Sequence, residues 1–129
     1  MLVALFDRRD RHHRSAAAQW ETLRGPISTV WPVITEALHL LDFSAPAREA
    51  IFDLVETGAM PLAPLSAEDV PRIRALMKKY ADIPMDLADA CLVRVAEREK
   101  IGTVYTFDGG FRIYAPSHRK RLKILPAAR

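Results

Sequence analysis

Residues 84–111 read PMDLADACLVRVAEREKIGTVYTFDGGF. The first half of this stretch has the apolar spacing of a helix, which we predict over Met85–Glu99. The second half contains a short apolar run, Thr103–Thr106, which predicts a buried strand. A helix that leads directly into a buried strand is typical of parallel α/β folds, because parallel strands need a crossover connection between them.

Carboxylates occur at the boundaries of both predicted elements. Asp86 and Asp89 lie three residues apart at the start of the helix, so they share one helix face. Asp108 follows the end of the strand. In an open α/β sheet, ligands bind where parallel strands end. Carboxylate oxygens are the ligands that Mg²⁺ and Mn²⁺ prefer, so the stretch predicts a divalent-metal site.

Each of these acids also has an ordinary structural explanation. Acidic residues in the first turn of a helix cap free N–H groups and favour its positive end. Asp108 precedes Gly109 and Gly110, which suits a turn. However, the face that carries the two helix acids continues into Val93 and Ala96, which indicates a surface turned inward. The combination of acids at separate boundaries favours the metal site.

The composition is that of an ordinary soluble protein. The chain has 129 residues, 50% of them hydrophobic and 27% charged, which fits a single domain over residues 1–129 with a real core. No apolar run approaches the roughly 18 to 20 residues of a membrane span, and the start MLVALFDRRD does not have the pattern of a signal peptide. The single cysteine, Cys91, excludes an internal disulfide and lies among apolar residues. We therefore expect a core thiol, a reducing compartment and a cytoplasmic location.

The net charge of +3 is mild but unevenly distributed. One basic cluster lies near the start of the chain and consists of Arg8, Arg9, Arg11 and Arg14. A second lies near the end and consists of His118, Arg119, Lys120, Arg121 and Lys123. Such clusters are usually solvated surfaces, but if the two met in space they would suit a polyanion such as RNA.

Helices and short apolar runs alternate along the rest of the chain. The run Leu2–Phe6 fits either a strand or a helix. We predict helices over Asp10–Leu23, Trp31–Leu41, Ala47–Glu56 and from a capping box at Ser66–Asp69 to about Tyr80. We predict short strands over Ile27–Thr29, Ala59–Leu65 and Leu122–Leu125, the second of them at a sheet edge because it contains prolines. This alternation predicts a mostly parallel α/β sandwich.

A further carboxylate, Glu36, lies on the predicted helix Trp31–Leu41. Glu36 is next to Val33 and Ala37 on the apolar side of that helix. A carboxylate there is costly unless it is paired or binds a metal, although a side chain at the edge of the stripe would reach water. The helix alone leaves both explanations open.

Four segments, taken in order, resemble PIN-domain proteins, and among them the VapC-type toxins of bacterial type II toxin–antitoxin pairs. They are LVALFDRRDRHH (2–13), STVWPVITEALHLL (28–41), MDLADACLVRVAERE (85–99) and TVYTFDGGFRIY (103–114). In the last segment, Thr106 matches the small hydroxyl residue before the family's acid, and Phe111 matches the aromatic residue after it. The resemblance covers nearly the whole chain and depends on the order and spacing of the segments.

The resemblance implies a three-layer α/β/α PIN-like domain with a short, mostly parallel central sheet. It also implies a metal-dependent ribonuclease, a hydrolase that uses Mg²⁺ or Mn²⁺ to cleave RNA phosphodiester bonds. Glu36, Asp89 and Asp108 would be the metal-binding acids, with Asp86 as a fourth catalytic carboxylate. The implied partners are an RNA substrate, a cognate antitoxin protein and a second copy of the chain in a homodimer.

The family's first acid has no counterpart here. In the family it ends a strand that precedes the segment matched by Leu2–Phe6, whereas this sequence begins at Met1. Three explanations remain open. The reading frame starts upstream, which we favour; the protein is degenerate and inactive; or Leu2–Phe6 acts as the strand, with Asp7 as the substitute acid.

Two alternatives to the nuclease follow from these residues. A catalytically inactive PIN-like protein would keep the fold and bind RNA or an antitoxin partner without cleaving RNA. A small α/β hydrolase would use the same acids on small phosphate esters. Cleavage assays on RNA and on small esters distinguish the three activities.

Overall fold

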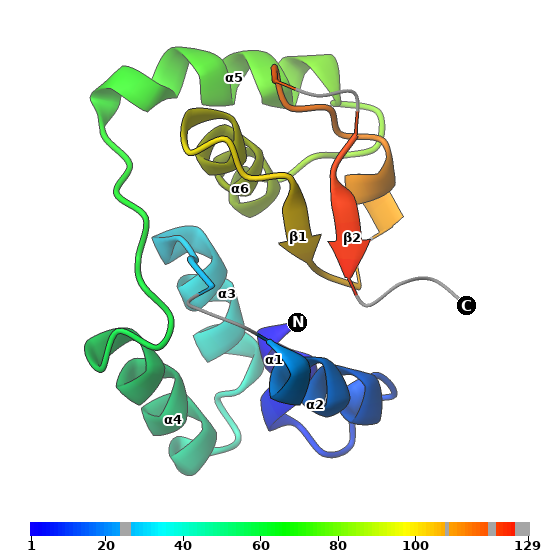
Figure 1. Cartoon of the computed structure of the whole chain (residues 1–129). Helices are drawn as coiled ribbons and strands as arrows, with labels where there is room; N and C mark the ends of the chain where they lie inside the picture. Colours follow the sequence, from blue (N-terminus) through cyan, green and yellow to red (C-terminus); the bar gives the residue numbers. More distant parts are fainter. Residues whose placement is uncertain (24–26, 108, 119–120, 126–129) are drawn as a thin grey trace. The chain divides into compact units, whose positions relative to one another are not determined.

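The computed structural model describes residues 1–23, 27–107, 109–118 and 121–125. The chain falls into two units, Met1–Ala63 and Pro64–Arg129, which we call the N-terminal unit and the C-terminal unit (Figure 1). None of the helices in the described ranges is long and apolar enough to span a membrane.

The N-terminal unit is helical. Its elements are α1 (Leu2–Phe6), α2 (His13–Thr22), α3 (Trp31–Leu40) and α4 (Ala45–Glu56). Helix α1 packs against both α2 and α3 (Figure 1). The core of this unit is a cluster of apolar side chains, made up of Leu2, Ile34, Ala37, Leu41, Ala47, Ile51 and Met60. This cluster explains the apolar stripes of the predicted helices, because the same side chains face one another here.

The ambiguous segment Leu2–Phe6 is a helix. The Leu5 N–H donates to the Met1 carbonyl over 3.0 Å, and the Asp7 N–H donates to the Val3 carbonyl over 2.8 Å. Burial of Leu2 in the helical core stabilises this conformation. The explanation in which Leu2–Phe6 serves as a strand, with Asp7 as the substitute acid, is therefore wrong.

Local signals fix the boundaries of α4. The Ser44 side chain accepts a hydrogen bond from the Ala47 N–H over 3.2 Å, as expected of an N-cap serine. After the helix, Gly58 has φ = 81°, a left-handed conformation that glycine adopts without strain. The observed helix begins two residues before the predicted one and ends with it, at Glu56.

The two short apolar runs of the N-terminal unit form much less sheet than predicted. Thr29 and Leu62 make one isolated parallel bridge, in which the Thr29 N–H donates to the Pro61 carbonyl over 2.9 Å. Pro61 and Pro64 explain this limit, because proline has no N–H to donate to a strand ladder.

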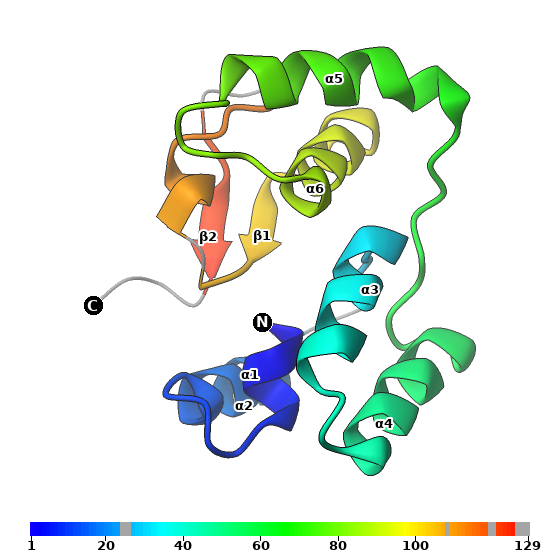
Figure 2. The ribbon, with the colours of Figure 1, turned by 180° about the vertical axis from the view of Figure 1, so that it is seen from behind.

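The C-terminal unit combines helices with a parallel pair of strands. Its elements are η1 (Ala67–Asp69), α5 (Val70–Lys79), α6 (Leu87–Arg98), β1 (Thr103–Tyr105), η2 (Gly109–Arg112) and β2 (Lys123–Leu125). The strands run side by side in both views, with Val104 opposite Ile124 (Figures 1 and 2). Helix α5 packs against α6. The predicted helix and strand of residues 84–111 are therefore confirmed, as is the predicted strand near the end of the chain.

The capping box at Ser66–Asp69 begins the helical part of this unit. The Ser66 N–H donates to the Asp69 carboxylate over 2.9 Å, and the Ser66 hydroxyl accepts from the Glu68 N–H over 3.3 Å. The box opens first a 3₁₀ turn, η1, and then α5. The prediction of a helix from this signal is confirmed, and Asp performs the function of the more usual Glu or Gln.

Cys91 lies in the interior of α6. It is a free cysteine with 3% of its surface exposed. Burial raises the pKa of the Cys91 thiol, and the negative charges of Asp69 and Asp86 raise it further. The predicted core thiol is confirmed.

Candidate functional site

The start of α6 brings two of the predicted acids together. Asp86 is the N-cap residue, and its Oδ1 atom accepts a hydrogen bond from the Asp89 N–H over 2.8 Å. The Asp86 residue is exposed, whereas Asp89 is buried with 9% of its surface exposed. The capping explanation thus holds for Asp86, while Asp89 is an inward-facing carboxylate in the first turn of the helix.

One member of an aromatic cluster contacts the carboxylate of Asp89. The Tyr114 hydroxyl donates to Asp89 Oδ2 over 3.2 Å. The Tyr114 ring packs against two other aromatic rings, those of Tyr80 and Phe111, with both pairs of ring centroids 5.1 Å apart. The buried carboxylate therefore has a polar partner, as a buried charge requires.

The other two predicted acids are Glu36 and Asp108. Glu36 is on α3 in the N-terminal unit, and it is exposed. Its carboxylate therefore reaches water, which is the second of the two explanations given for it. Asp108 lies outside the described residues. Within the ranges that the structure describes, no three His, Cys, Asp or Glu side chains gather closely enough to hold a metal ion. The convergence of Glu36, Asp86, Asp89 and Asp108 stays a prediction.

The donor chemistry of the predicted acids fits Mg²⁺ or Mn²⁺. All four are carboxylates, and these hard cations are bound mainly by oxygen. Asp86 and Asp89 meet at one helix terminus, where a bound cation would stabilise a partly buried acidic pair. No Cys or His side chain is needed for such a site, which agrees with the buried, high-pKa thiol of Cys91.

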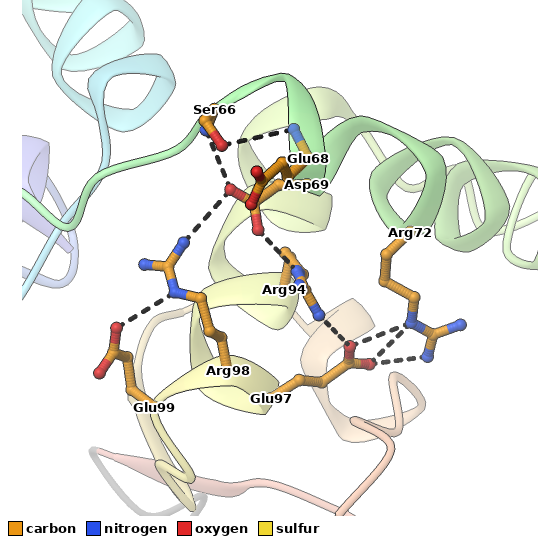
Figure 3. Close-up of polar contacts among 8 residues, drawn as sticks. All are labelled: Ser66, Glu68, Asp69, Arg72, Arg94, Glu97, Arg98 and Glu99. Atoms are coloured by element: carbon orange, nitrogen blue, oxygen red, sulfur yellow. Dashed lines mark hydrogen bonds and ion pairs between the residues drawn. The ribbon is translucent and has the colours of Figure 1, made fainter.

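A second group of charged side chains joins α5 to α6. Asp69 Oδ1 accepts a hydrogen bond from Arg94 Nε over 2.8 Å, and Asp69 Oδ2 pairs with Arg98 Nη1 at 3.3 Å (Figure 3). Asp69 is only 4% exposed. The same carboxylate caps the start of the helix through Ser66, so it serves both the helix terminus and the interhelical contact.

Glu97 is the other buried carboxylate of this network. It is 3% exposed, and its shortest contact is a hydrogen bond of 2.7 Å between Arg72 Nη2 and Glu97 Oε1 (Figure 3). Arg72 Nε lies 3.1 Å from Oε1 and 3.0 Å from Oε2 of the same carboxylate. Arg94 Nη1 lies 3.8 Å from Oε2, and the Ser117 N–H donates to Oε1 over 3.1 Å. Through its bonds to Arg72 and Ser117, Glu97 therefore links α5 and the segment around Ser117 to α6.

The surroundings of these two carboxylates lower both pKa values. For Asp69, the hydrogen bond from the Ser66 N–H and then that from Arg94 outweigh burial and hold the pKa below its ordinary value. For Glu97, burial raises the pKa, but the hydrogen bonds and charge of Arg72, the Ser117 N–H and the charge of Arg94 together outweigh burial, so its pKa is also below the ordinary value. Arg72 responds in the opposite direction, since its bond to Glu97 raises the pKa of the guanidinium.

Acidification is expected to destabilise the C-terminal unit through Asp69 and Glu97. Both folded-state pKa values lie below the ordinary values of 3.8 and 4.5, so the unfolded chain takes up these protons first. Their contribution is complete above about pH 5 and is lost as the pH falls towards the folded-state pKa values. Urea titrations between about pH 7 and pH 3 should show this loss, and Glu97→Gln should make the fall shallower. A free energy of unfolding that is constant over this range contradicts the prediction.

The arginines of the basic cluster near the start of the chain are all exposed, and we call them the arginine patch (Arg8, Arg9, Arg11 and Arg14). Asp7 shapes it, because Asp7 Oδ1 accepts from the Arg9 N–H over 3.0 Å. The Arg9 guanidinium lies 4.5 Å from the centroid of the Phe43 ring, which is itself 53% exposed. A cation over an aromatic face is held by the ring's quadrupole but remains accessible to an anion.

The second basic cluster belongs to the C-terminal unit. Arg121 and Lys123 are exposed, and His118 Nε2 lies 2.9 Å from the Ile101 carbonyl oxygen. Arg119 and Lys120 lie outside the described residues. A meeting of the two basic clusters stays a prediction.

Comparison with known proteins places the chain in a family. The family model described as the PIN domain matches residues 1–115. The chain belongs to the PIN-domain family. Residues 1–115 include α1 to α6 and the acids Glu36, Asp86 and Asp89. The predicted family is thereby confirmed.

A solved structure has the same fold. The crystal structure of the Mycobacterium tuberculosis toxin VapC20, which cleaves the sarcin–ricin loop, matches with a TM-score of 0.76 and 20% sequence identity. The match covers 84% of this chain and 85% of that chain. A comparison with curated protein sequences gave no match. The predicted PIN-like α/β fold with a short parallel sheet is confirmed.

Three residues of the PIN domain's C-terminal unit were not singled out from sequence for the contacts they make. They are Asp69 and Glu97, which form the ionic network, and Tyr114, which contacts Asp89. The pair Arg94 and Glu97, spaced i, i+3 within a largely apolar helix, is a signal that indicates buried charge. Tyr114 carried no such signal beyond its place in the segment that resembles the family.

Proposed function

We propose that this PIN-domain protein is a metal-dependent endoribonuclease of the VapC type, the toxin component of a toxin–antitoxin pair. The observation that carries the proposal is the buried carboxylate of Asp89, held at the start of α6 in a chain of this family. The structural similarity to VapC20, a toxin that cleaves RNA, supports the same activity. The single PIN-like domain over residues 1–129 is part of this proposal.

The proposed site uses the predicted acids to hold Mg²⁺ or Mn²⁺. Glu36, Asp89 and Asp108 would be its ligands, and Asp86 would add negative charge next to Asp89. A bound divalent cation supplies Lewis-acid stabilisation of phosphate charge and an activated water. The protein's own contribution is to keep Asp89 buried and ordered, so that its charge is available at a fixed position.

The arginine patch supports RNA as the substrate class. Its four side chains are exposed on the N-terminal unit, where their charges are available to phosphates. Phe43, under the Arg9 guanidinium, adds an exposed aromatic side chain of the kind that contacts unpaired bases. An acidic metal site repels RNA until a cation is bound, so separate cationic contacts are needed to retain the substrate.

The remaining partners are proposed from the family resemblance. They are a cognate antitoxin protein and a second copy of the chain in a homodimer. We also propose a cytoplasmic location, for which the free, buried Cys91 is the support, since cytosolic proteins keep their cysteines reduced.

The test of the proposed function is cleavage of RNA by the purified chain with and without divalent cations. Ribosomal RNA and an isolated sarcin–ricin hairpin are suitable substrates, with a small phosphate ester as the control. We expect cleavage in Mg²⁺ or Mn²⁺, a loss of at least about 100-fold in EDTA, and recovery when Mn²⁺ is restored in excess.

Three results would contradict this proposal. Binding of RNA without cleavage in either cation would favour the inactive PIN-like protein. Turnover of the small ester, with RNA left intact, would favour the small α/β hydrolase. Cleavage that persists in EDTA would point to a contaminating ribonuclease or to a reaction that needs no metal.

A further inference from the structure

The hydroxyl of Tyr114 is placed by the structure around it. Tyr114 is 1% exposed, and its ring packs at 59° to the ring of Tyr80 and at 74° to the ring of Phe111. The two ring contacts hold the Tyr114 side chain, so its hydroxyl has little freedom to move. The Tyr80 hydroxyl has a different role, because it accepts the Ala115 N–H over 3.0 Å.

The Tyr114 hydroxyl contacts Asp89, the carboxylate that we propose as a metal ligand. Tyr114 Oη donates to Asp89 Oδ2 over 3.2 Å in a buried environment. At the other end of the same residue, the Asp89 N–H is held by Asp86 Oδ1 over 2.8 Å. A carboxylate otherwise rotates easily about its last side-chain torsion, because that torsion has broad minima. The hydrogen bond from Tyr114 limits this rotation.

We propose that Tyr114 is a positioning residue, whose hydroxyl holds the Asp89 carboxylate in the orientation that binds the divalent cation. This inference rests on the proposed function, since it takes Asp89 as a metal ligand. Hydrogen bonds to metal ligands orient them before the metal arrives, and their loss typically weakens metal binding by about 10- to 100-fold. Tyr114 therefore acts on the metal through Asp89.

The test compares Mn²⁺ binding by the wild-type chain, Tyr114→Phe and Tyr80→Phe, measured by electron paramagnetic resonance of free Mn²⁺. Tyr114→Phe keeps both ring contacts and removes only the hydroxyl that reaches Asp89. Tyr80→Phe is the matched control, because it removes a hydroxyl from the same aromatic cluster that bonds the Ala115 N–H instead. Urea midpoints of both variants show whether each is folded.

We expect Tyr114→Phe to raise the Kd for Mn²⁺ by about 10-fold or more, and Tyr80→Phe to leave it within about 2-fold of wild type. RNA cleavage by Tyr114→Phe should recover towards the wild-type rate as the metal concentration is raised. If the Tyr114 hydroxyl contributed only to stability, Tyr114→Phe would lower the urea midpoint and would bind Mn²⁺ as tightly as Tyr80→Phe does.

The outcomes separate this inference from the proposed function. If the wild-type chain binds Mn²⁺ and Tyr114→Phe binds it equally well or more tightly, the role of Tyr114 is overturned while the nuclease proposal stands. If the two tyrosine variants weaken Mn²⁺ binding to the same extent, the role of Tyr114 is again overturned. If the wild-type chain binds no Mn²⁺, the metal site itself is overturned, and the inference with it.

Discussion

Glu97→Ala should lower the free energy of unfolding by about 3 kcal/mol or more. Removing one partner of a buried ion pair typically costs 3–5 kcal/mol, because the remaining charge loses its compensation. Glu97 is 3% exposed and accepts its shortest bond from Arg72 over 2.7 Å, with Arg94 at 3.8 Å. The side chains of Arg72 and Arg94 are 34% and 26% exposed, so water offsets part of the loss and favours the lower end of the range. Urea-induced unfolding measures the difference.

Glu99 offers a matched control for this substitution. It lies two residues further along and pairs with Arg98 over 3.1 Å, but its side chain is 51% exposed. An exposed pair of this kind contributes about 0–1 kcal/mol, so Glu99→Ala should have a small effect. Glu97→Gln keeps the shape of the side chain and provides a measurable variant if Glu97→Ala does not fold. Equal losses for Glu97→Ala and Glu99→Ala would show that the buried network contributes little.

Asp89→Asn should abolish metal-dependent RNA cleavage and leave the fold intact. Asparagine keeps an oxygen that can accept the hydrogen bond from Tyr114, so the aromatic cluster loses no partner. It removes the negative charge that would bind the cation. Since the hydrogen-bonding partners of ligands alone contribute about 10- to 100-fold, loss of a ligand should reduce the cleavage rate by at least about 100-fold. Single-turnover cleavage in Mn²⁺ and a urea titration measure activity and stability in parallel.

Two further aspartate variants sharpen this test. Asp82→Asn removes one negative charge from an exposed position of the same unit and should leave cleavage unchanged. Asp86→Asn preserves the helix cap, because asparagine is as good an N-cap residue as aspartate, and so tests only the charge of Asp86. Asp89→Asn with the cleavage rate of wild type would count heavily against the nuclease.

Local signals allowed much of the fold to be predicted. The capping box at Ser66, the Asp86 cap and the apolar spacing of Met85–Glu99 each act within about one or two helical turns. The strand at Thr103–Tyr105 was equally clear, because a short β-branched and aromatic run follows a helix end. Where such signals were weak, as in Leu2–Phe6, five apolar residues fitted both a strand and a helix, and packing in the core decided between them.

Contacts between distant residues were not predictable from pattern. Tyr114 and Asp89 are 25 positions apart, as are Arg72 and Glu97, so no helical or strand periodicity relates them. The capping function of Asp69 was predicted from Ser66, but its pairs with Arg94 and Arg98 depend on how α5 lies against α6. For the site, sequence identified the acids at the start of α6, and the structure added the partner that orients one of them.

The wide sequence separation of the charged network has a kinetic consequence. The pairs that Arg72 and Asp69 make with α6 join residues 25 and 29 positions apart, so they form only after α5 and α6 have come together. Interactions that are absent from the folding transition state lower the unfolding rate and have little effect on the folding rate. We therefore expect the charged network to slow the unfolding of the packed helices α5 and α6, and to leave their folding rate almost unchanged.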